Sequence, residues 1–409
     1  MRAARTPWHL LRRPRCLGSS ASRPCLPIWR RNIRIEGLDG GNEKTHYYGQ
    51  TPDLLKGIIE TVRNGILPLD IFEAIRTEML ARPPQITLDI MSPTNSTLLN
   101  IVLADHIPER CRKGKLDVGS VEPTQWLPEG HHLVYFPLQK TTSQLCPDGT
   151  DPYHSPGSPF DLRMWAGGSI EFNKPFWLNS APAECWESIE DVTLKGPEGQ
   201  EKIFVTVLRD YMLSTDRKSD VNPPEPRIRE RRKLVFMRGL SESQAQARRL
   251  DTVSSKKGIN FPLQPSSSFS IKPTPRLLFY YSALSFNAHL IHLDRSYCRD
   301  QEGHPNLLVH GPLSLTLMLS ALSAELRSHQ KNPLQIRRID YRNLAPLYAD
   351  EDMFVCVRPM KQKLADDLPR QGEEEYDQNW DVWIRDHDNR LSVRGTVEVG
   401  QLKDPIINN

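Results

Sequence analysis

The 409-residue sequence lacks the features that mark several protein classes. Its seven cysteines are scattered and form neither a C-x-x-C pair nor a zinc spacing, which indicates a reducing interior without a disulfide framework. No stretch approaches the roughly 18 consecutive apolar residues of a membrane span. The formal net charge of +3 is too small to favour nucleic acid binding. There is no P-loop, and no G-x-G-x-x-G follows a predicted strand, so nucleotide-dependent redox or phosphoryl transfer is not indicated.

Acidic residues are absent from the first 35 positions, where nine arginines alternate with Ala, Leu, Ser and Trp before Glu36. An Arg-rich, Ser-containing and acid-free segment is typical of an organelle transit peptide. A secretory signal needs an apolar core of about 7–15 residues, which this segment does not have. We therefore predict a mitochondrial transit peptide over residues 1–40 and a matrix location, with a disordered basic tail as the alternative.

The rest of the chain divides into two segments that alternate helix and strand patterns. Helical periodicity runs through Thr51–Leu80, with a break at Pro68, and returns at Thr97–Ala104. Strands of this first segment are predicted at His132–Phe136, Ser169–Phe172, Ala183–Lys195, Lys202–Asp210 and Lys233–Arg238. Serine- and proline-rich residues 239–275 then predict a linker. The N-terminal domain is accordingly expected at residues 50–238.

The second segment, residues 276–405, contains a helix that is apolar around most of its circumference, Pro312–Arg327. Such a helix must be buried, so a sheet has to curl around it. Its predicted strands are Leu277–Tyr281, Ile336–Tyr341, Met353–Arg358, Asn379–Asp386 and Arg390–Val399. We predict an α+β fold in which each half is a curved antiparallel sheet wrapped on a helix, although the N-terminal helix is less obvious. Sequence identity between the halves is too weak to identify a repeat.

A polar loop inside Tyr281–Leu313 is the most informative stretch. It brings Asn287, His289 and His292 close together and ends at a helix start, His310-Gly311-Pro312. Chemistry on an acyl thioester needs a group that moves a proton beside the carbonyl and N–H donors for the oxygen that gains charge. A histidine-rich loop that leads into the N-terminus of a buried helix supplies both.

These residues resemble the catalytic loop of the MaoC-like, double hot-dog hydratase/dehydratase family. There an acidic residue is followed five positions later by a histidine and then by a segment ending in V-H-G. Asn287 stands at the acidic position, His292 at the histidine, and Leu308-Val309-His310-Gly311-Pro312 forms the second segment. Further motifs resemble the branch with mesaconyl-CoA hydratases and fungal mitochondrial hydroxyacyl-thioester dehydratases type 2, namely Leu133–Pro137, Arg163–Gly168, Tyr341–Leu347 and Val393–Thr396.

The resemblance, over roughly residues 80–400, implies tandem hot-dog folds packed as a pseudo-dimer within one chain. The acyl chain would lie in a tunnel between the halves, the N-terminal half would shape the pocket, and the C-terminal half would carry the catalytic loop. His292 is the candidate acid/base, since an unperturbed histidine titrates near pH 6.5. The amide of Gly311, at a helix N-terminus, is the candidate oxyanion donor.

Four further residues are candidates for substrate binding, and each has a structural alternative. His289 is a polar contact to substrate, a supporting residue behind the contact, or a solvent-facing residue. His310 either touches substrate or caps and packs. Arg163 is an available cation for a second carboxylate, and Trp165 lines the acyl tunnel or belongs to the core. His131 and His132 form no metal constellation with a nearby carboxylate pair, so neither a metal nor a cofactor is predicted.

Asn287 departs from the family pattern, because an amide cannot accept a proton and only orients water or the leaving hydroxyl. The site is then either active through His292 with Asn287 as positioner, or inactive. The resulting prediction is a (3R)-hydroxyacyl-thioester dehydratase of mitochondrial fatty acid synthesis that acts on coenzyme A or acyl carrier protein thioesters. The alternatives are a mesaconyl- or itaconyl-type acyl-CoA hydratase and a catalytically dead hot-dog protein that binds acyl carrier protein. No nucleic acid or membrane span is expected, and a homo-oligomer of pseudo-dimers is compatible with the sequence.

Overall fold

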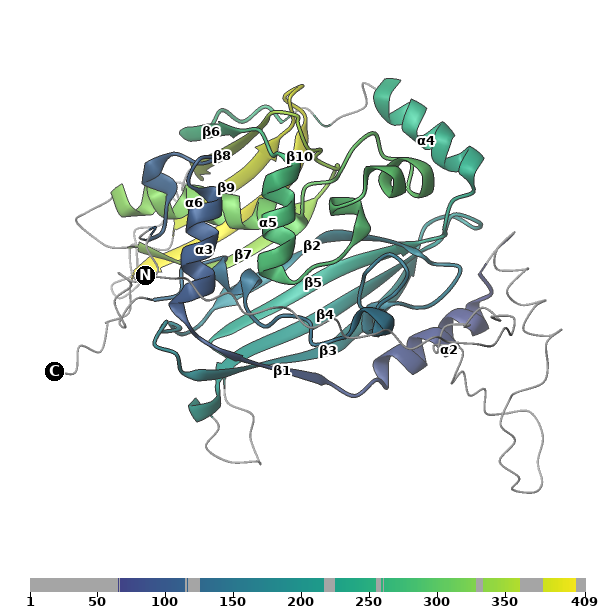
Figure 1. Cartoon of the computed structure of the whole chain (residues 1–409), viewed down its shortest axis with the longest axis horizontal. Helices are drawn as coiled ribbons and strands as arrows, with labels where there is room; N and C mark the ends of the chain where they lie inside the picture. The colour runs from purple at the N-terminus through teal and green to yellow at the C-terminus, as the bar shows by residue number, and fades with distance from the viewer. Residues whose placement is uncertain are drawn as a thin grey trace, which may run out of the picture. The chain divides into compact units, whose positions relative to one another are not determined.

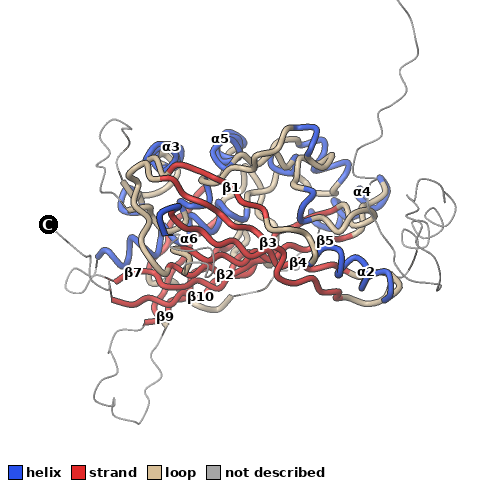
Figure 2. Tube along the Cα trace, turned by 90° about the horizontal axis from the view of Figure 1, so that it is seen from below, coloured by secondary structure: helices blue, strands red, loops and turns tan. Residues whose placement is uncertain are grey.

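An antiparallel sheet of ten strands forms the framework of the described chain (Figure 1). The order across the sheet is β1-β3-β4-β5-β2-β7-β10-β9-β8-β6. In chain order the strands are β1 (Gln85–Ile90), β2 (Leu162–Phe172), β3 (Pro182–Lys195), β4 (Lys202–Leu213), β5 (Ile228–Met237), β6 (Ser267–Ile271), β7 (Leu334–Asn343), β8 (Met353–Pro359), β9 (Gln378–Arg385) and β10 (Leu391–Gln401). Figure 2 shows α3, α4 and α5 on one side of this sheet.

This computed structural model describes residues 65, 67–114, 116, 126–216, 225–254, 259, 261–328, 334–360 and 378–401. All of them belong to one compact unit, His46–Asn409. The predicted transit peptide and residues 51–64 of the predicted helical segment Thr51–Leu80 lie outside the described residues. Helix α2 (Leu69–Leu80) confirms the part of that segment after Pro68. None of the described helices is long and apolar enough to cross a bilayer.

The strand order repeats itself about the centre of the sheet. The first five strands run β1-β3-β4-β5-β2, and the last five follow the same order reversed, with β6 and β7 in the places of β1 and β2. The central strands β2 and β7 pair antiparallel, with Gly167 opposite Arg342 and Glu171 opposite Arg338. The repeat that is too weak to identify in the sequence is therefore plain in the topology, and the predicted α+β pseudo-dimer is confirmed.

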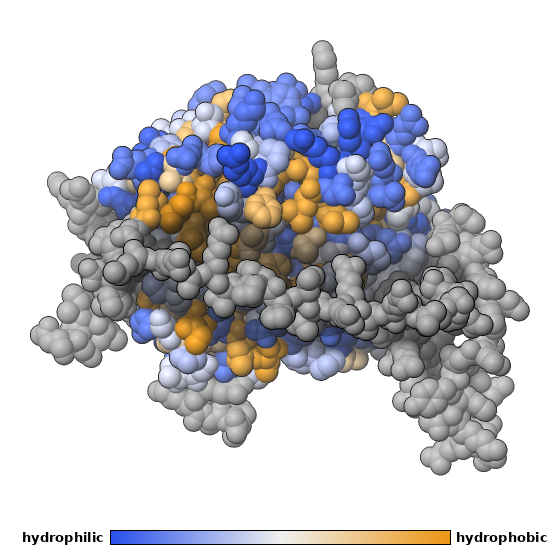
Figure 3. All heavy atoms as spheres, in the orientation of Figure 1, coloured by the Kyte–Doolittle hydropathy of each residue, from blue (hydrophilic) through white to orange (hydrophobic). Residues whose placement is uncertain are grey.

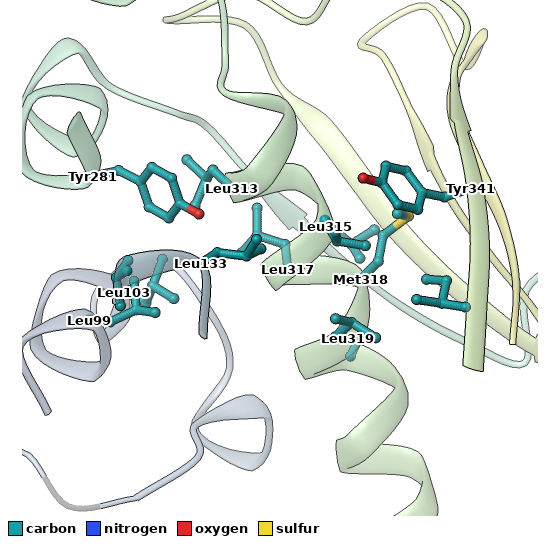
Figure 4. Close-up of a cluster of buried hydrophobic side chains, with 14 of the residues drawn as sticks. Leu99, Leu103, Leu133, Tyr281, Leu313, Leu315, Leu317, Met318, Leu319 and Tyr341 are labelled. Carbon is teal, nitrogen blue, oxygen red and sulfur yellow. The ribbon is translucent and has the colours of Figure 1, made fainter. Parts of the chain in front are cut away.

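Helix α6 (Gly311–Ser328) is the central helix of the C-terminal half and packs against β7, β8 and β9. Its apolar residues are buried on every side, as predicted from the sequence. Figure 4 shows Leu313, Leu317 and Leu319 of this helix among side chains from both halves of the chain. One hydrophobic cluster spans the two halves and a second lies under α2, so the halves share most of their core.

The other helices are α2 (Leu69–Leu80), α3 (Pro93–Leu103), α4 (Glu242–Ser254) and α5 (Pro275–Ser285). Short helical turns are η2 (Glu109–Cys111), η4 (His131–Val134), η5 (Thr142–Gln144), η6 (Pro152–His154), η7 (Ser214–Asp216), η8 (Leu290–His292) and η9 (Tyr297–Gln301), of which η9 is π-helical. Helix α3 confirms the prediction at Thr97–Ala104. It packs against α5 and η4 rather than along the N-terminal sheet, so the N-terminal half is covered differently from the C-terminal half.

Two predicted strands are wrong. Leu277–Tyr281 belongs to α5, because Thr274 caps the helix by accepting a hydrogen bond from the Leu277 amide and Pro275 occupies its first turn. His132–Phe136 is not a strand either. Gly130 takes a left-handed conformation, and the amides of Leu133 and Tyr135 donate to carbonyls three residues back, which winds the segment into η4.

The segment predicted as a linker, residues 239–275, contains more structure than a linker would. Helix α4 packs against η9, and β6 pairs with β8 at the edge of the sheet, with Phe269 opposite Val355. The periodicity of β6 is hidden by three consecutive serines, which is why the sequence indicated a loop there.

Apolar side chains are exposed on the face that carries α3 and α5 (Figure 3). The exposed residues on these two helices and directly after α5 are Leu98, Ile101, Phe279, Tyr280 and Phe286. Exposed apolar side chains therefore extend from α3 and α5 to the start of the loop after α5.

Removal of a central α6 side chain tests the role of this helix. Leu317 is completely buried, so Leu317→Ala should lower the free energy of unfolding by about 2–5 kcal/mol. Leu344→Ala is the control, since Leu344 is 43% exposed and surface changes cost about 0.5 kcal/mol or less. Urea denaturation measures both, and equal losses in the two variants would contradict a core centred on α6.

Candidate active site

The polar loop leaves α5 through a tight turn at Phe286. Phe286 takes a left-handed conformation with φ of 52°, and the amide of Asn287 donates back to the Ser282 carbonyl at 2.9 Å. The Asn287 side-chain oxygen in turn accepts from the amide of His289 at 3.1 Å. Because that oxygen is occupied within the loop, the Asn287 side chain offers its NH₂ group to a ligand.

His292, at the end of η8, is held in one tautomer. Its Nδ1 lies 2.8 Å from the Leu308 carbonyl oxygen. A carbonyl only accepts, so Nδ1 carries the proton and donates it, which leaves a lone pair on Nε2. Burial lowers the pKa of His292 to about 4, against the raising effect of the Leu308 bond, and Arg163 lowers it further. His292 is therefore a neutral base at physiological pH.

His310 packs directly on His292 with the two rings stacked at 3.6 Å and 22°. Its Nε2 is 2.8 Å from the Ser282 hydroxyl oxygen, and burial holds its pKa well below the usual range. Its Nδ1 is buried with no hydrogen-bond partner among the described residues. His310 thus covers one face of His292 and ties that ring to α5.

Helix α6 begins at Gly311, directly after His310. The amides of a first helical turn have no partner within the helix and favour negative charge. A Cβ at Gly311 would lie 3.2 Å from the Asn343 amide nitrogen and 3.5 Å from the Trp165 side chain. A glycine is therefore what lets the start of α6 approach β2 and β7 so closely.

His289 is buried rather than solvent-facing. Its ring stands edge-on to that of His292, with centroids 5.7 Å apart. Its Nε2 lies 3.4 Å from Asp148 Oδ2 and 3.8 Å from Glu302 Oε1. Burial, together with the charges of His292 and Arg163, holds the pKa of His289 well below its usual range. Two carboxyl groups thus stand behind this histidine.

A turn from the N-terminal half fixes the histidine loop. The backbone carbonyl of Asp148 accepts from the Leu290 amide at 2.9 Å. Gly149, with φ of +83°, approaches so closely that a Cβ there would lie 2.1 Å from the Ala288 carbonyl oxygen. In the sequence this segment is readable only as a turn, Pro147-Asp148-Gly149-Thr150, so its role was not predicted.

Arg163 and Trp165 approach the site from β2. One terminal nitrogen of Arg163, Nη1, is buried and has no hydrogen-bond partner in the described part of the chain. Burial lowers the pKa of Arg163 and Asp148 raises it, and an arginine remains cationic under such conditions. The Trp165 indole N–H donates to Tyr341 Oη at 3.0 Å and to the Gly167 carbonyl. Because this donor is already satisfied, Trp165 fits a role in the pocket wall better than a hydrogen bond to a ligand.

A groove of about 400 Å³ opens beside the histidine loop. Its lining comes from both halves of the chain and consists of Pro137, Leu138, Gln139, Lys140, Thr141, Gln144 and Phe286. Phe286 immediately precedes Asn287 in the chain, but none of the seven predicted site residues lines this groove.

Three buried residues, Asp151, His154 and Glu187, bring possible metal ligands within 4.8 Å of one another. Two cations already accompany them. The Lys140 ammonium lies 2.9 Å from Asp151, and the Arg209 guanidinium lies 3.0 Å from Glu187. Since these pairs balance the two carboxylates, the arrangement is that of an ion-pair network.

Comparison with known proteins gives a family and a fold. The sequence model of the family "Hydroxyacyl-thioester dehydratase type 2" matches residues 130–349, which contain all seven predicted site residues. The mitochondrial hydroxyacyl-thioester dehydratase type 2 of Schizosaccharomyces pombe is 28% identical over 284 residues, 66% of this chain and 88% of that protein. The mesaconyl-C(4)-CoA hydratase of Chloroflexus aurantiacus is 30% identical over 253 residues, 60% of this chain and 79% of that protein.

Among solved structures, a MaoC-like dehydratase from Phytophthora capsici is 12% identical and has a TM-score of 0.52. The alignment covers 80% of this chain and 99% of that one. At this identity the likeness concerns the fold, and it agrees with the paired half-sheets described above.

The contact between Gly149 and Ala288 should control turnover. Gly149→Ala places a methyl group against the Ala288 carbonyl and should displace the histidine loop, lowering kcat by about a hundredfold, since misplacement of about 1 Å has that effect. Gly157→Ala is the matched control, because Gly157 has nearly the same φ of +88° but nothing within 4 Å of its Cβ position. Steady-state kinetics on both folded variants measures the difference, and equal losses would show that backbone strain alone is responsible.

Proposed function

Because this chain belongs to the hydroxyacyl-thioester dehydratase type 2 family, we propose that it dehydrates (3R)-hydroxyacyl thioesters, reversibly, in mitochondrial fatty acid synthesis. The observation that carries the proposal is the neutral His292, whose Nε2 is unprotonated beside the N-terminus of α6. The acyl group is carried on coenzyme A or on acyl carrier protein.

The site residues divide the reaction between them. His292 Nε2 removes the proton from C2 of the substrate, a kind of step that contributes about 10²–10⁴-fold in enzymes. Charge then develops on the thioester oxygen, where the Gly311 amide donates; one such donor is worth about 2.7–4 kcal/mol. The NH₂ group of Asn287 orients the hydroxyl that leaves C3, since its oxygen is held by the loop.

The two halves of the chain serve different purposes in this proposal. The C-terminal half, residues 276–405, carries the histidine loop and α6, while the N-terminal half, residues 50–238, shapes the pocket through β2 and the turn at Asp148. The S. pombe relative and a Saccharomyces cerevisiae relative of the same name are both described as mitochondrial. Together with the arginine-rich residues 1–35, their names support a matrix location.

Three arginines in and directly before β5 are paired with carboxylates. Arg227 pairs with Asp216, Arg229 with Asp210, and Arg232 with Glu230. These three arginines are therefore less available to the phosphates of a carrier.

A dicarboxylic substrate is the second candidate, and one observation favours it. Nη1 of Arg163 is a buried donor with no hydrogen-bond partner among the described residues, and the charge of Arg163 acts on His289 and His292. A buried donor that makes no hydrogen bond is costly unless a ligand accepts from it. A mesaconyl-C(4)-CoA hydratase is among the relatives. Arg163 would then hold the distal carboxylate.

Replacement of the base tests the main proposal. His292→Ala should lower kcat for hydration of a straight-chain trans-2-enoyl-CoA by at least about a hundredfold, because water is a poor substitute for a positioned base. His387→Ala, which changes an exposed histidine, is the control. Chiral analysis of the product should give the (3R)-hydroxyacyl thioester. Near-normal activity in His292→Ala would overturn the assignment of the base.

Arg163→Ala separates the two substrate classes. If the straight-chain acyl thioester is the substrate, its turnover should stay within about threefold of wild type, since the straight-chain acyl group has no second carboxylate for Arg163 to bind. If a dicarboxylic acyl group is the substrate, the variant should lose mesaconyl-CoA hydration by at least about a hundredfold, because a buried charge pair is broken. Parallel assays on the two thioesters measure this. Absence of wild-type turnover on either thioester and on their carrier-protein forms would favour an inactive binding protein.

A further inference from the structure

We propose that Glu302 takes the part of the carboxylate that is missing at position 287, and that it acts through His289. The inference rests on the proposed function, because it concerns the proton that the leaving hydroxyl needs. The catalytic loop of the wider MaoC-like family, which this loop resembles, has an acidic residue at this position, and Asn287 cannot exchange a proton. The structure brings two other carboxyl groups to the histidine loop, from positions that no loop motif includes.

The position of His289 supports a proton path. It lies between His292, which it meets edge-on, and the carboxyl groups of Asp148 and Glu302. Its Nε2 is buried and makes no hydrogen bond within the described chain. Catalytic hydrogen bonds are often long before substrate binds and shorten in the complex, so the 3.8 Å to Glu302 Oε1 is compatible with proton exchange.

Glu302 is almost completely buried, with 1% of its surface exposed. Six titratable or charged groups lie around it: Tyr297 Oη of η9 at 3.4 Å, His304 Nε2 at 3.7 Å, His289, Cys298 of η9, Arg248 of α4, and Asp148. Only Arg248 among them is a permanent cation, and one of its terminal nitrogens also lies 3.5 Å from His304 Nε2. Burial, aided by Asp148 and opposed by Arg248, raises the pKa of Glu302 to about 7. Glu302 can therefore hold or release a proton at physiological pH.

Asp148 has a different role, although it lies closer to His289. Its Oδ1 accepts from both the amide and the hydroxyl of Thr150, at 3.0 and 2.7 Å. Its charge also acts on Arg163. With these partners Asp148 holds the turn and Arg163 in place, and Glu302 is the carboxyl group whose pKa is raised.

The proton balance of the dehydration requires one proton on the enzyme. The C2–H bond breaks, its proton goes to His292 Nε2, and its electron pair forms the C2=C3 double bond. The C3–O bond breaks, and the leaving hydroxide takes the Nδ1 proton of His289 while Glu302 delivers its own proton to Nε2. The proton on His292 then returns through His289 to Glu302. In hydration the same steps run backward, so Glu302 is a positioning residue that acts through His289 in both directions.

This scheme predicts the pH profile of kcat. The active form has a neutral His292 and a protonated Glu302. Activity should therefore fall as pH drops through about 4, because His292 becomes protonated on Nε2 as well. It should also fall as pH rises through about 7, because Glu302 loses its proton. A single histidine that works as both base and acid would show no decline linked to a carboxyl near pH 7.

Glu302→Gln is the test, because glutamine keeps the shape and removes the titration. We expect kcat to fall at least about tenfold, KM to change little, and the decline above pH 7 to disappear. Glu201→Gln is the matched control, since Glu201 is also buried but binds Arg238 and the Leu67 amide, and its pKa is lowered to about 2. This control should keep the wild-type profile. A folded Glu302→Gln variant with the wild-type kcat and the same decline would overturn the proposal.

Two further measurements cover the remaining outcomes. If Glu302→Gln does not fold, Glu302→Asp is the second variant, because it keeps a carboxyl group on a shorter side chain. It should show a reduced kcat and the same decline above pH 7. Loss of that decline would contradict the proposal. Infrared titration of the full chain without substrate should show a carboxyl that ionises near pH 7 in the wild type and in Glu201→Gln. If no such carboxyl is found, Glu302 is not the proton store and the proposal fails. If the wild type shows this carboxyl but turns over no thioester, the proposed function is contradicted while the proton store stands.

Discussion

Burial of α6 on all sides is the constraint on which the rest of the structure depends. A helix with leucines around its whole circumference has no face for solvent, so β7, β8 and β9 curl around it and the N-terminal half closes the remaining side. The pairing of β2 with β7 makes the two half-sheets continuous. That pairing brings Trp165 on β2 against Gly311 at the start of α6, so the core and the candidate site are parts of one arrangement.

The exclusion of water from the site follows from the same packing. Four histidines, His289, His292, His304 and His310, are buried around the loop, and desolvation lowers the pKa of each. Neutral imidazoles are bases, and they also cost less to bury than imidazolium ions. Desolvation moves the pKa of Glu302 in the other direction. One physical effect therefore leaves a histidine without its proton and a carboxyl with a proton in the same small volume, which is the separation that acid–base catalysis needs.

The candidate site belongs to both halves of the chain. The loop with His289 and His292 comes from the C-terminal half, but the turn at Asp148 and Gly149 fixes it from the N-terminal half, and Arg163 approaches from β2. A single half would lack the backbone contact in which the Asp148 carbonyl holds the Leu290 amide. The pseudo-dimer is thus required for the geometry of the loop.

The sequence by itself determined the elements whose signals are local. The leucines of α6, the strands of the large hairpins, the Asn287…His292 spacing and the glycine at the helix start were all readable, because periodicity and motif spacing act over a few residues. It misassigned Leu277–Tyr281 and His132–Phe136, whose apolar runs fit strand and helix equally until capping by Thr274 and the turn at Gly130 decide. Only the tertiary structure decided which carboxyl groups stand behind His289, since Asp148 is 141 positions before it along the chain and Glu302 is separated by the π-helical turn η9. Contacts between such distant segments depend on packing and on the shared core, and no local pattern in the sequence records them.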